Sequence, residues 1–277
     1  MQRIVIQAGK LRKHYWEDLW RFRGLFYFLA WRDVKVRYKQ TAIGIIWNVL
    51  RPLLTIGAFW FIGWMFSIPD QGVPRVLLVA AATLPWQFFS SAFSESSNSL
   101  IANSNLLTKV YFPRLIVPTS TVIVCLIDFL ISFIIILVLM VIYRFPPTPQ
   151  ILFLPVFLLL AIITALGTGI FISALNVKYR DFRYIIPFIV QFGLYASPVA
   201  FSSADIYEST RIPQVLKFIY SLNPMVGVID GFRWSILGGN IKIYWQGFII
   251  SVGISIFFLL LGVWYFRRTE KNFADIV

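Results

Sequence analysis

The sequence contains little charge. Asp, Glu, Lys and Arg together make up 13% of the 277 residues, whereas hydrophobic residues make up 58%. A soluble domain carries about 25% charged and roughly 45–50% apolar residues, so this chain has too few charges to cover a surface in contact with water. These proportions exclude a soluble protein and predict an integral membrane protein.

Residues that commonly carry catalysis or bind metals are also scarce. The single cysteine, Cys125, lies in an apolar run, and the single histidine is His14. One thiol and one imidazole exclude a disulfide framework, a His-rich metal site and Ser-His-Asp chemistry. The only Gly-Lys pair, Gly9-Lys10, is followed by Leu11, so the phosphate-binding motif G-x-x-x-x-G-K-[ST] does not occur. We expect no enzymatic activity, metal or cofactor in this chain.

Apolar runs predict an all-α fold with six transmembrane helices, since a helix needs about 20 apolar residues to cross a bilayer. The predicted spans cover residues 43–66, 75–93, 115–143, 151–175, 184–201 and 245–266. The fifth is short and is bounded by Pro187 and Pro198. The chain is therefore expected to consist of a cytoplasmic segment (1–42), a membrane domain (43–266) and a cytoplasmic tail (267–277).

The basic residues are unevenly distributed between the two sides of these spans. Eighteen of the 25 Lys and Arg residues precede the first span, follow the second or fourth, or lie in the tail, and Arg51 lies inside the first span. The opposite side carries Arg75, Arg144, Arg211, Lys217, Arg233 and Lys242. The positive-inside rule therefore places both termini in the cytoplasm. The basic N-terminus is not followed directly by an apolar core, so we expect no cleavable signal peptide. The net charge of +13 indicates topology and requires no nucleic-acid partner.

Two further segments are apolar but too short to cross. Apolar residues recur at helical spacing from Tyr15 to Phe26, opposite Glu17 and Asp18, which predicts an amphipathic helix lying in the membrane interface. The alternative is a basic segment that only anchors the chain to the membrane and has no part in its mechanism. Residues 224–237 predict short re-entrant helices in the last outer loop, because a seventh span would place the basic tail outside. Here the alternative is an amphipathic surface loop.

Asp128 is the only acid well inside an apolar run, while Glu95 lies at the end of the second span. An acid within a membrane is a candidate for a proton relay or a substrate contact. The other interpretation is structural, with Asp128 paired to Arg51 or to a polar residue between helices.

Aromatic residues are abundant, at 18%. Some belong to the aromatic belts at the membrane surfaces, or pack against lipid. Because the C–H faces of sugar rings pack against aromatic rings, we also expect a subset to line a path for a neutral or weakly charged glycan. The candidate channel residues are Trp60, Trp64, Trp86, Phe88, Phe89, Phe188, Phe192 and Tyr195.

Several motifs, in order along the chain, resemble one known family. They are residues 31–47 (WRDVKVRYKQTAIGIIW) followed by Arg51-Pro52-Leu53, 105–114 (NLLTKVYFPR), 179–182 (YRDF), 197–199 (SPV), 223–225 (NPM) and 232–233 (FR). This pattern resembles the permease subunits of ABC transporters that export polysaccharides (type-2 ABC exporters), including O-antigen, capsule and teichoic-acid exporters.

The resemblance implies a homodimer of permeases that pairs with two cytoplasmic ATPase subunits in a bacterial inner membrane. The ATPases would bind ATP and Mg. ATP hydrolysis would drive a lipid-linked glycan through a channel between the permeases, and the resemblance favours O-antigen as that glycan. Capsular polysaccharide and teichoic acid are alternatives within the family. Two alternatives come from other classes. One is an ion-coupled carrier that uses Asp128. The other is a membrane glycosyltransferase, against which the scarcity of carboxylates and histidines near the span ends counts.

The resemblance also implies roles for particular residues. The loop 98–114 would hold a coupling helix that docks into the ATPase, and the loop 176–183 would be a second contact. The ATPase-coupling residues would be Asn105, Leu106, Leu107, Lys109, Val110, Tyr111, Arg180 and Asp181. An outer gate near the channel exit would contain Asn223, Pro224, Met225, Phe232 and Arg233.

Overall fold

The computed structural model describes residues 15–39, 42–66, 72–238 and 241–273, and every regular element in these ranges is helical. Five helices of this part of the chain are long and apolar enough to cross a membrane. They are α3 (Ala42–Met65), α4 (Arg75–Ala102), α6 (Ile116–Ile142), α7 (Leu154–Lys178, extended at its start by the 3₁₀-helix η1, Pro149–Phe153) and α12 (Trp245–Thr269). The prediction of an all-helical integral membrane protein is confirmed.

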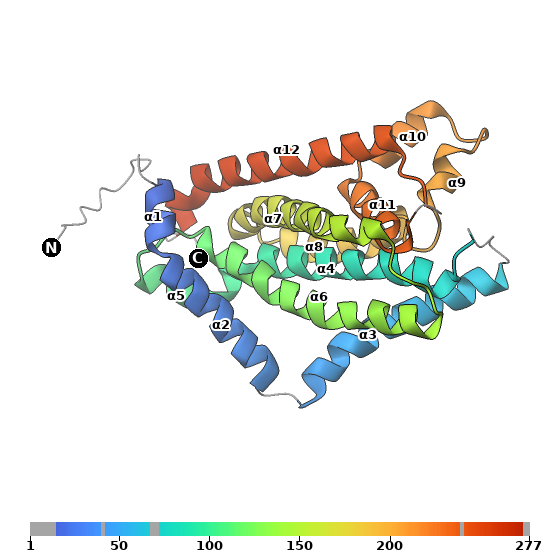
Figure 1. The fold of residues 1–277 in the computed structure, drawn as a ribbon. Coiled ribbons are helices and arrows are strands. Elements are labelled where there is room, and N and C mark those ends of the chain that lie inside the picture. Colours follow the sequence, from blue (N-terminus) through green and yellow to red (C-terminus); the bar gives the residue numbers. More distant parts are fainter. Residues whose placement is uncertain (1–14, 40–41, 67–71, 239–240, 274–277) are drawn as a thin grey trace.

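Helix α4 is the centre of the bundle. It packs against α6 on one side and α7 on another, and α12 covers α7 (Figure 1). In the apolar window of α4, 78% of the residues are buried inside the chain, against 17% in that of α3. Helix α3 therefore lies at the edge of the bundle and leaves most of its surface open.

The end of α4 differs from the sequence prediction. The second span was expected to stop at residue 93, but α4 continues to Ala102 through a run of serines and asparagines. These side chains donate hydrogen bonds to backbone carbonyls of the same helix. Asn98 Nδ2 donates to the Ser94 carbonyl at 2.8 Å, and Ser99 Oγ donates to the Ser96 carbonyl at 2.7 Å. A helix can carry such residues when their polar groups are satisfied locally. Glu95 consequently lies within the helix.

The fifth predicted span forms only a short helix. Helix α8 (Phe182–Ala196) has 15 residues, about 22 Å of helix against a hydrocarbon core of about 30 Å. It stops where Ser197 adopts an extended conformation before Pro198, as expected for a residue that precedes proline. The count of six spans therefore depends on α8 together with the turn and bend residues that follow it.

The segment before α12 folds into three short helices, α9 (Ser203–Tyr207), α10 (Gln214–Ser221) and α11 (Pro224–Leu237). Almost all of α11 is buried against α4, α7 and α12. It begins where Asn223 Oδ1 accepts a hydrogen bond from the Met225 amide at 3.0 Å, a standard N-cap. It ends at Gly238, whose φ of 71° suits glycine. Helix α11 is therefore an interior element, and residues 224–237 are not an amphipathic surface loop.

The N-terminal helices are α1 (Tyr15–Arg21) and α2 (Arg23–Lys39). The apolar face expected to enter lipid instead packs on protein, because Tyr15, Leu19 and Phe22 join a cluster with Leu100 and Phe266. Helix α2 then packs against α6. The outward-facing aromatic residues of α1 and α2 are Trp16, Trp20, Tyr27, Phe28 and Trp31. Residues 1–14, including Gly9, Lys10 and His14, and the tail residues 274–277 lie outside the described part.

The bundle has two distinct ends. At one, which we call the α1 end, Arg267 stacks over Tyr15 and Arg114 contacts Glu270. At the other, the α9 end, Arg233 contacts Leu78 near the start of α4. Among the described residues, Arg114 and Arg267 of the larger basic group lie at the α1 end, and Arg233 of the smaller group lies at the α9 end. Arg37, counted among the residues before the first span, lies inside the bundle.

Candidate substrate path

The open face of α4 is polar. Between residues 79 and 100 all α4 side chains are buried except five, and all five are polar. These five residues, which we call the α4 polar stripe, are Gln87, Ser91, Ser94, Glu95 and Asn98. Their spacing places them on one side of the helix. Polar groups in a membrane helix face protein or water in preference to lipid, so this face of α4 is not expected to face lipid.

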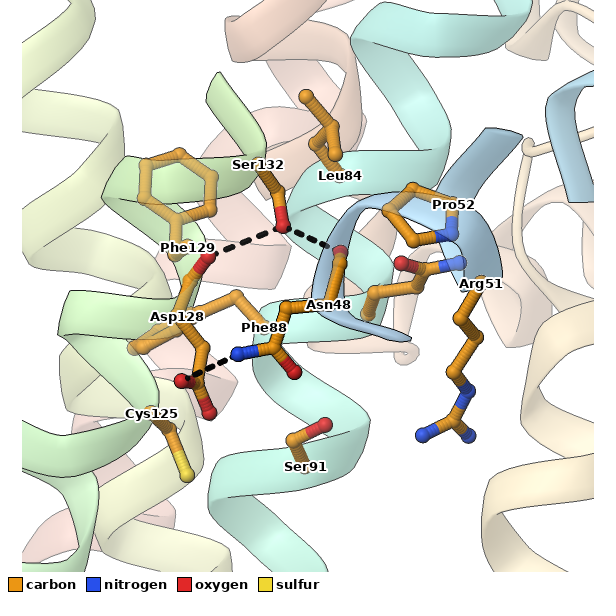
Figure 2. A pocket seen from close by; sticks show the side chains of 11 residues that line it. Asn48, Arg51, Pro52, Leu84, Phe88, Ser91, Cys125, Asp128, Phe129 and Ser132 are labelled. Carbon is orange, nitrogen blue, oxygen red and sulfur yellow. Dashed lines mark hydrogen bonds between the residues drawn. The ribbon is translucent and has the colours of Figure 1, made fainter. Parts of the chain in front are cut away.

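An open cavity lies beside Gln87 and Ser91 of the stripe, between α3, α4 and α6 (Figure 2). Its polar lining comes from Asn48, Arg51, Gln87, Ser91, Asp128 and Ser132, together with Cys125 and the apolar Pro52, Leu84, Phe88 and Phe129. Gln87 Nε2 donates to Thr55 Oγ1 at 3.2 Å and so joins α4 to α3. The cavity combines hydrogen-bonding groups with two opposite charges, those of Arg51 and Asp128.

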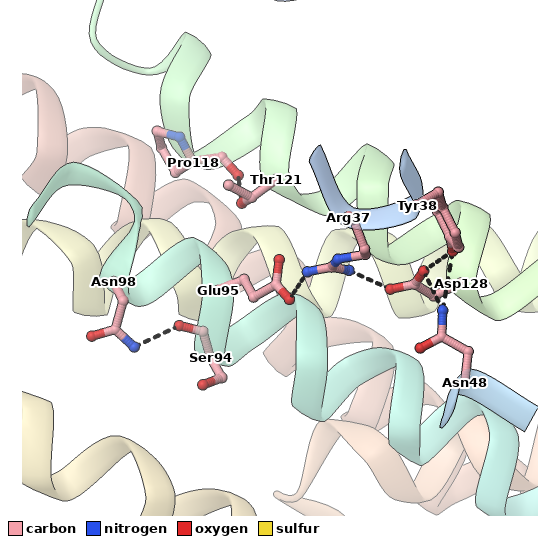
Figure 3. A network of polar contacts seen from close by, with 9 residues as sticks. All are labelled: Arg37, Tyr38, Asn48, Ser94, Glu95, Asn98, Pro118, Thr121 and Asp128. Atoms are coloured by element: carbon pink, nitrogen blue, oxygen red, sulfur yellow. Dashed lines mark hydrogen bonds and ion pairs between the residues drawn. The ribbon is translucent and has the colours of Figure 1, made fainter. Parts of the chain in front are cut away.

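Asp128 belongs to a charge network that ties four helices together (Figure 3). The Arg37 guanidinium from α2 pairs with both Asp128 of α6 and Glu95 of α4. Tyr38 Oη also donates to Asp128, and Asn48 Nδ2 of α3 donates to Asp128 Oδ1 at 2.8 Å. Both acids in this part of the membrane domain therefore bind the same cation.

Arg37, and not Arg51, is the cationic partner of Asp128. The sequence interpretation proposed Arg51 or a polar residue between helices, and the polar residue is Asn48. Helix α2 packs against α6 and so brings Arg37 to Asp128. The Arg51 side chain points away from Asp128 (Figure 2). Within the described part of the chain, the Arg51 guanidinium makes no hydrogen bond or ion pair.

The aromatic residues expected to line a channel fall into two groups. Trp86, Phe88 and Phe89 are buried in the core of this chain, where the Phe88 ring meets the Phe129 ring at 5.7 Å. The exposed residues are Trp60 and Trp64 on α3 and Phe188, Phe192 and Tyr195 on one side of α8. The second group leaves aromatic surfaces open on α3 and α8.

The residues expected to contact an ATPase lie at the α1 end. Helix α5 (Ser104–Lys109) exposes Asn105 and Lys109, and Val110 and Tyr111 follow it on the surface. Arg180 and Asp181 are exposed in the turn between α7 and α8. Leu106 is half-buried, and Leu107 is only 4% exposed, packed in the cluster that contains Phe112. Leu107 is therefore an anchor for α5 and is not available on the surface.

The residues expected to form an outer gate hold α11 in place. Arg233 is 1% exposed and donates to the carbonyl oxygens of Leu78 at 3.2 Å, Phe201 at 2.9 Å and Val199 at 3.2 Å. The Phe232 ring lies 5.9 Å from the Phe129 ring. Met225 is buried, while Asn223 and Pro224 at the start of α11 are half-buried. These contacts connect α11 to α4, α6 and the segment after α8.

The profile of the ABC-2 type transporter family matches residues 24–237. The chain belongs to the ABC-2 type transporter family. The match extends from α2 to the end of α11 and so includes the α4 polar stripe, the cavity and the charge network. Members of this family are membrane subunits of transporters and are not themselves catalytic. This ABC-2 chain is accordingly a transport subunit.

Three relatives carry the same name. The chain is 29% identical over 250 residues to an O-antigen export system permease protein RfbA of Klebsiella pneumoniae, covering 89% of this chain and 92% of the relative. A second protein of that name from Klebsiella pneumoniae is 29% identical over 253 residues, with the same coverage. One from Myxococcus xanthus is 28% identical over 217 residues, covering 78% of this chain and 81% of the relative.

Two features of this ABC-2 chain were not identified from its sequence. The first is the role of Arg37, which appeared only as one of many basic residues before the first span. The second is a brace at the α1 end, where Glu270 Oε1 accepts from the Arg114 amide at 2.7 Å and the Glu270 carbonyl accepts from the Arg114 guanidinium. Burial raises the pKa of the Glu270 carboxyl, and the Arg114 amide opposes this shift. The brace joins the last helix to the segment beside α5.

Proposed function

We propose that this chain is the transmembrane permease subunit of an ATP-driven exporter that moves a lipid-linked polysaccharide of the O-antigen class across the bacterial inner membrane. Two copies would form the path, and two ABC ATPase subunits would bind ATP and Mg and supply the energy. The family assignment supports a transport subunit, and the relatives named for O-antigen export support the substrate class.

The observation that carries the proposal is the α4 polar stripe. Its neutral members offer amide and hydroxyl groups, which exchange hydrogen bonds with sugar hydroxyls as readily as with water. From Gln87 to Asn98 the stripe extends about 16 Å along the helix, roughly half the thickness of the hydrocarbon core. One chain provides one polar wall. A second copy supplies the opposite wall, with the open aromatic faces of α3 and α8 beside it.

The proposal also assigns the two ends of the bundle. The α1 end faces the cytoplasm, because it holds the larger group of basic residues. The exposed part of α5 and the turn at Arg180 then meet the ATPase, and α9 to α11 lie toward the outer surface, where α11 borders the exit. The α8 segment completes six crossings, so the N-terminal segment and the tail share the cytoplasmic side.

An export assay tests the proposal. Cells lacking this chain should lose long surface glycan, accumulate lipid-linked glycan inside, and regain export with the parent chain. Ser94→Leu places an apolar group in the middle of the α4 polar stripe and should reproduce the loss. Gly253→Leu adds the same group to the open surface of α12, where no atom lies within 4 Å of the added Cβ, and should export normally. Normal surface glycan in cells without the chain would reject the proposal.

A further inference from the structure

The end of α8 separates an exposed helix from a buried segment. Along the whole of α8 only Ile186 is buried. Ala196, its last residue, is exposed, whereas the three residues that follow, Ser197 to Val199, are all buried. The chain therefore changes from a helix with an open surface to a segment enclosed by protein between two consecutive residues.

Polar side chains of α11 hold the buried segment. Asp230 Oδ1 accepts a hydrogen bond from Ser203 Oγ at the start of α9. Arg233 donates to the carbonyl oxygens of Val199 at 3.2 Å and Phe201 at 2.9 Å. Both charged side chains are buried, and burial is costly for such groups unless these bonds are made. The segment after α8 is therefore held on α11 as one unit with it.

Asn223 joins this unit to α8 itself. Its Oδ1 accepts from the Met225 amide at 3.0 Å, which caps the start of α11. Its Nδ2 donates to Ser197 Oγ at 2.9 Å and to the Ala196 carbonyl at 3.3 Å. The last carbonyls of a helix have no partner within that helix, so the Asn223 amide caps α8. One side chain thus binds the end of one helix and the start of another.

The polar attachment of α8 is concentrated at this end. Within the described part of the chain, no other side-chain hydrogen bond or ion pair joins α8 to another element. A close backbone approach lies near the same end, where a Cβ added at Gly193 would meet the Trp86 ring of α4 at 2.6 Å. At its other end, α8 follows the exposed turn that contains Arg180.

We infer that Asn223 is a positioning residue for α8, which fixes one end of this helix on α11 and so sets where its exposed aromatic face lies. Ser197 and Pro198, at which the helix stops, form the joint about which the rest of α8 tilts. This inference rests on the proposed function, since it concerns α8 as a wall of the same glycan path. Asn223 keeps Phe192 and Tyr195 beside that path while the opposite end of α8 moves.

Hydrogen exchange of the full-length chain in nanodiscs tests the attachment. Asn223→Ser keeps an oxygen that caps α11 but loses the amide that reaches α8. Backbone amides of residues 192–201 should exchange about fivefold or more faster, because hydrogen bonds that hold the end of the helix are lost. Amides of residues 226–237 in α11 should exchange as in the parent. Gln214→Ser makes the same change at an exposed position of α10 and should alter neither region.

Two further measurements separate positioning from a general loss of stability. Ser197→Ala removes one of the two acceptors and should have a smaller effect than Asn223→Ser. The double variant should exchange no faster than Asn223→Ser alone, since both changes break the same contact. In proteoliposomes that also contain the ATPase, Asn223→Ser should decrease the amount of glycan exported per ATP hydrolysed.

Four results would overturn the inference. Two of them are parent-like exchange of residues 192–201 in Asn223→Ser and equal acceleration along α11, which would indicate a damaged helix start. The others are additive effects of the Ser197 and Asn223 changes, and parent-like export per ATP despite faster exchange. Failure of the proposed function is distinguishable, because it would appear as normal surface glycan in cells lacking the chain, whereas the exchange measurements need no substrate.

Discussion

The carboxylate of Asp128 on α6 is paired with the guanidinium of Arg37 on α2. The two residues are 91 positions apart in the sequence. Helix α2 therefore packs on the membrane domain as part of it. The pair explains why an acid in the middle of an apolar helix is tolerated.

Asp128→Asn tests this structural role. The change removes one charge of a half-buried pair, so we expect a loss of roughly 1–2 kcal/mol in unfolding free energy. Glycan export should continue and should not depend on a proton gradient. Melting in detergent and export in vesicles with and without an imposed gradient measure the two effects. Arg37→Gln, which leaves both Glu95 and Asp128 without their cation, should be less stable than Asp128→Asn. A gradient-dependent export that disappears in Asp128→Asn would support an ion-coupled carrier.

Leu107 and Val110 lie three residues apart at the α1 end, but substitutions at the two positions should have different effects on stability and on ATPase binding. Leu107→Ala removes a buried side chain and should lower stability by roughly 2–5 kcal/mol. Val110→Asp changes a side chain that is 50% exposed, so melting should be unchanged while co-purification with the ATPase and glycan-dependent ATP hydrolysis decrease. Normal ATPase binding by the Val110 variant would place the contact elsewhere.

The close approach of α7 and α12 predicts contrasting effects of two glycine substitutions. A Cβ added at Gly262 would meet the Gly167 carbonyl oxygen at 2.5 Å and the Phe171 amide nitrogen at 3.3 Å. Because both are backbone atoms, the helices must separate, and Gly262→Ala should cost about 1–3 kcal/mol. At Gly253 no atom lies within 4 Å of an added Cβ, so Gly253→Ala should be neutral or slightly stabilising, since alanine favours helix. Equal melting of the two variants would contradict this packing.

Glu270 predicts a pH effect at the α1 end. Burial raises the pKa of its carboxyl above the ordinary value of 4.5, so the folded protein binds this proton more tightly than the unfolded chain does. The contribution of Glu270 to stability is then largest below the ordinary pKa and decreases as the pH rises through the folded-state pKa. Glu270→Gln keeps an acceptor for the Arg114 amide and removes the charge. Melting measured from about pH 4 to pH 7 should decrease less steeply with pH in the variant, and identical slopes would reject the assignment.

The spans could be predicted because lipid requires long apolar runs, which are visible without any tertiary information. The partner of Asp128 could not be predicted from the sequence. Arg37 reaches Asp128 only because α2 packs against α6, and nothing in the local sequence indicates that packing. Trp86 and Phe192 look alike in an apolar run, yet one is buried and the other exposed, because burial depends on neighbouring helices.

The α4 polar stripe is visible in the sequence as a helical spacing of polar residues. Its five members recur at helical spacing, although the polar composition of residues 94–99 by itself favours the end of a span. A helical plot extended past residue 93 would have placed Ser94, Glu95 and Asn98 on the same side as Gln87 and Ser91.

The charge network also affects how the protein is made. Arg37 leaves the ribosome 58 residues before Glu95 and 91 residues before Asp128. The first two helices therefore reach the translocation machinery before the acids that neutralise them exist, and they settle only after α6 is synthesised. A nascent chain released before Glu95 and Asp128 are synthesised would retain Arg37 without either of its carboxylate partners.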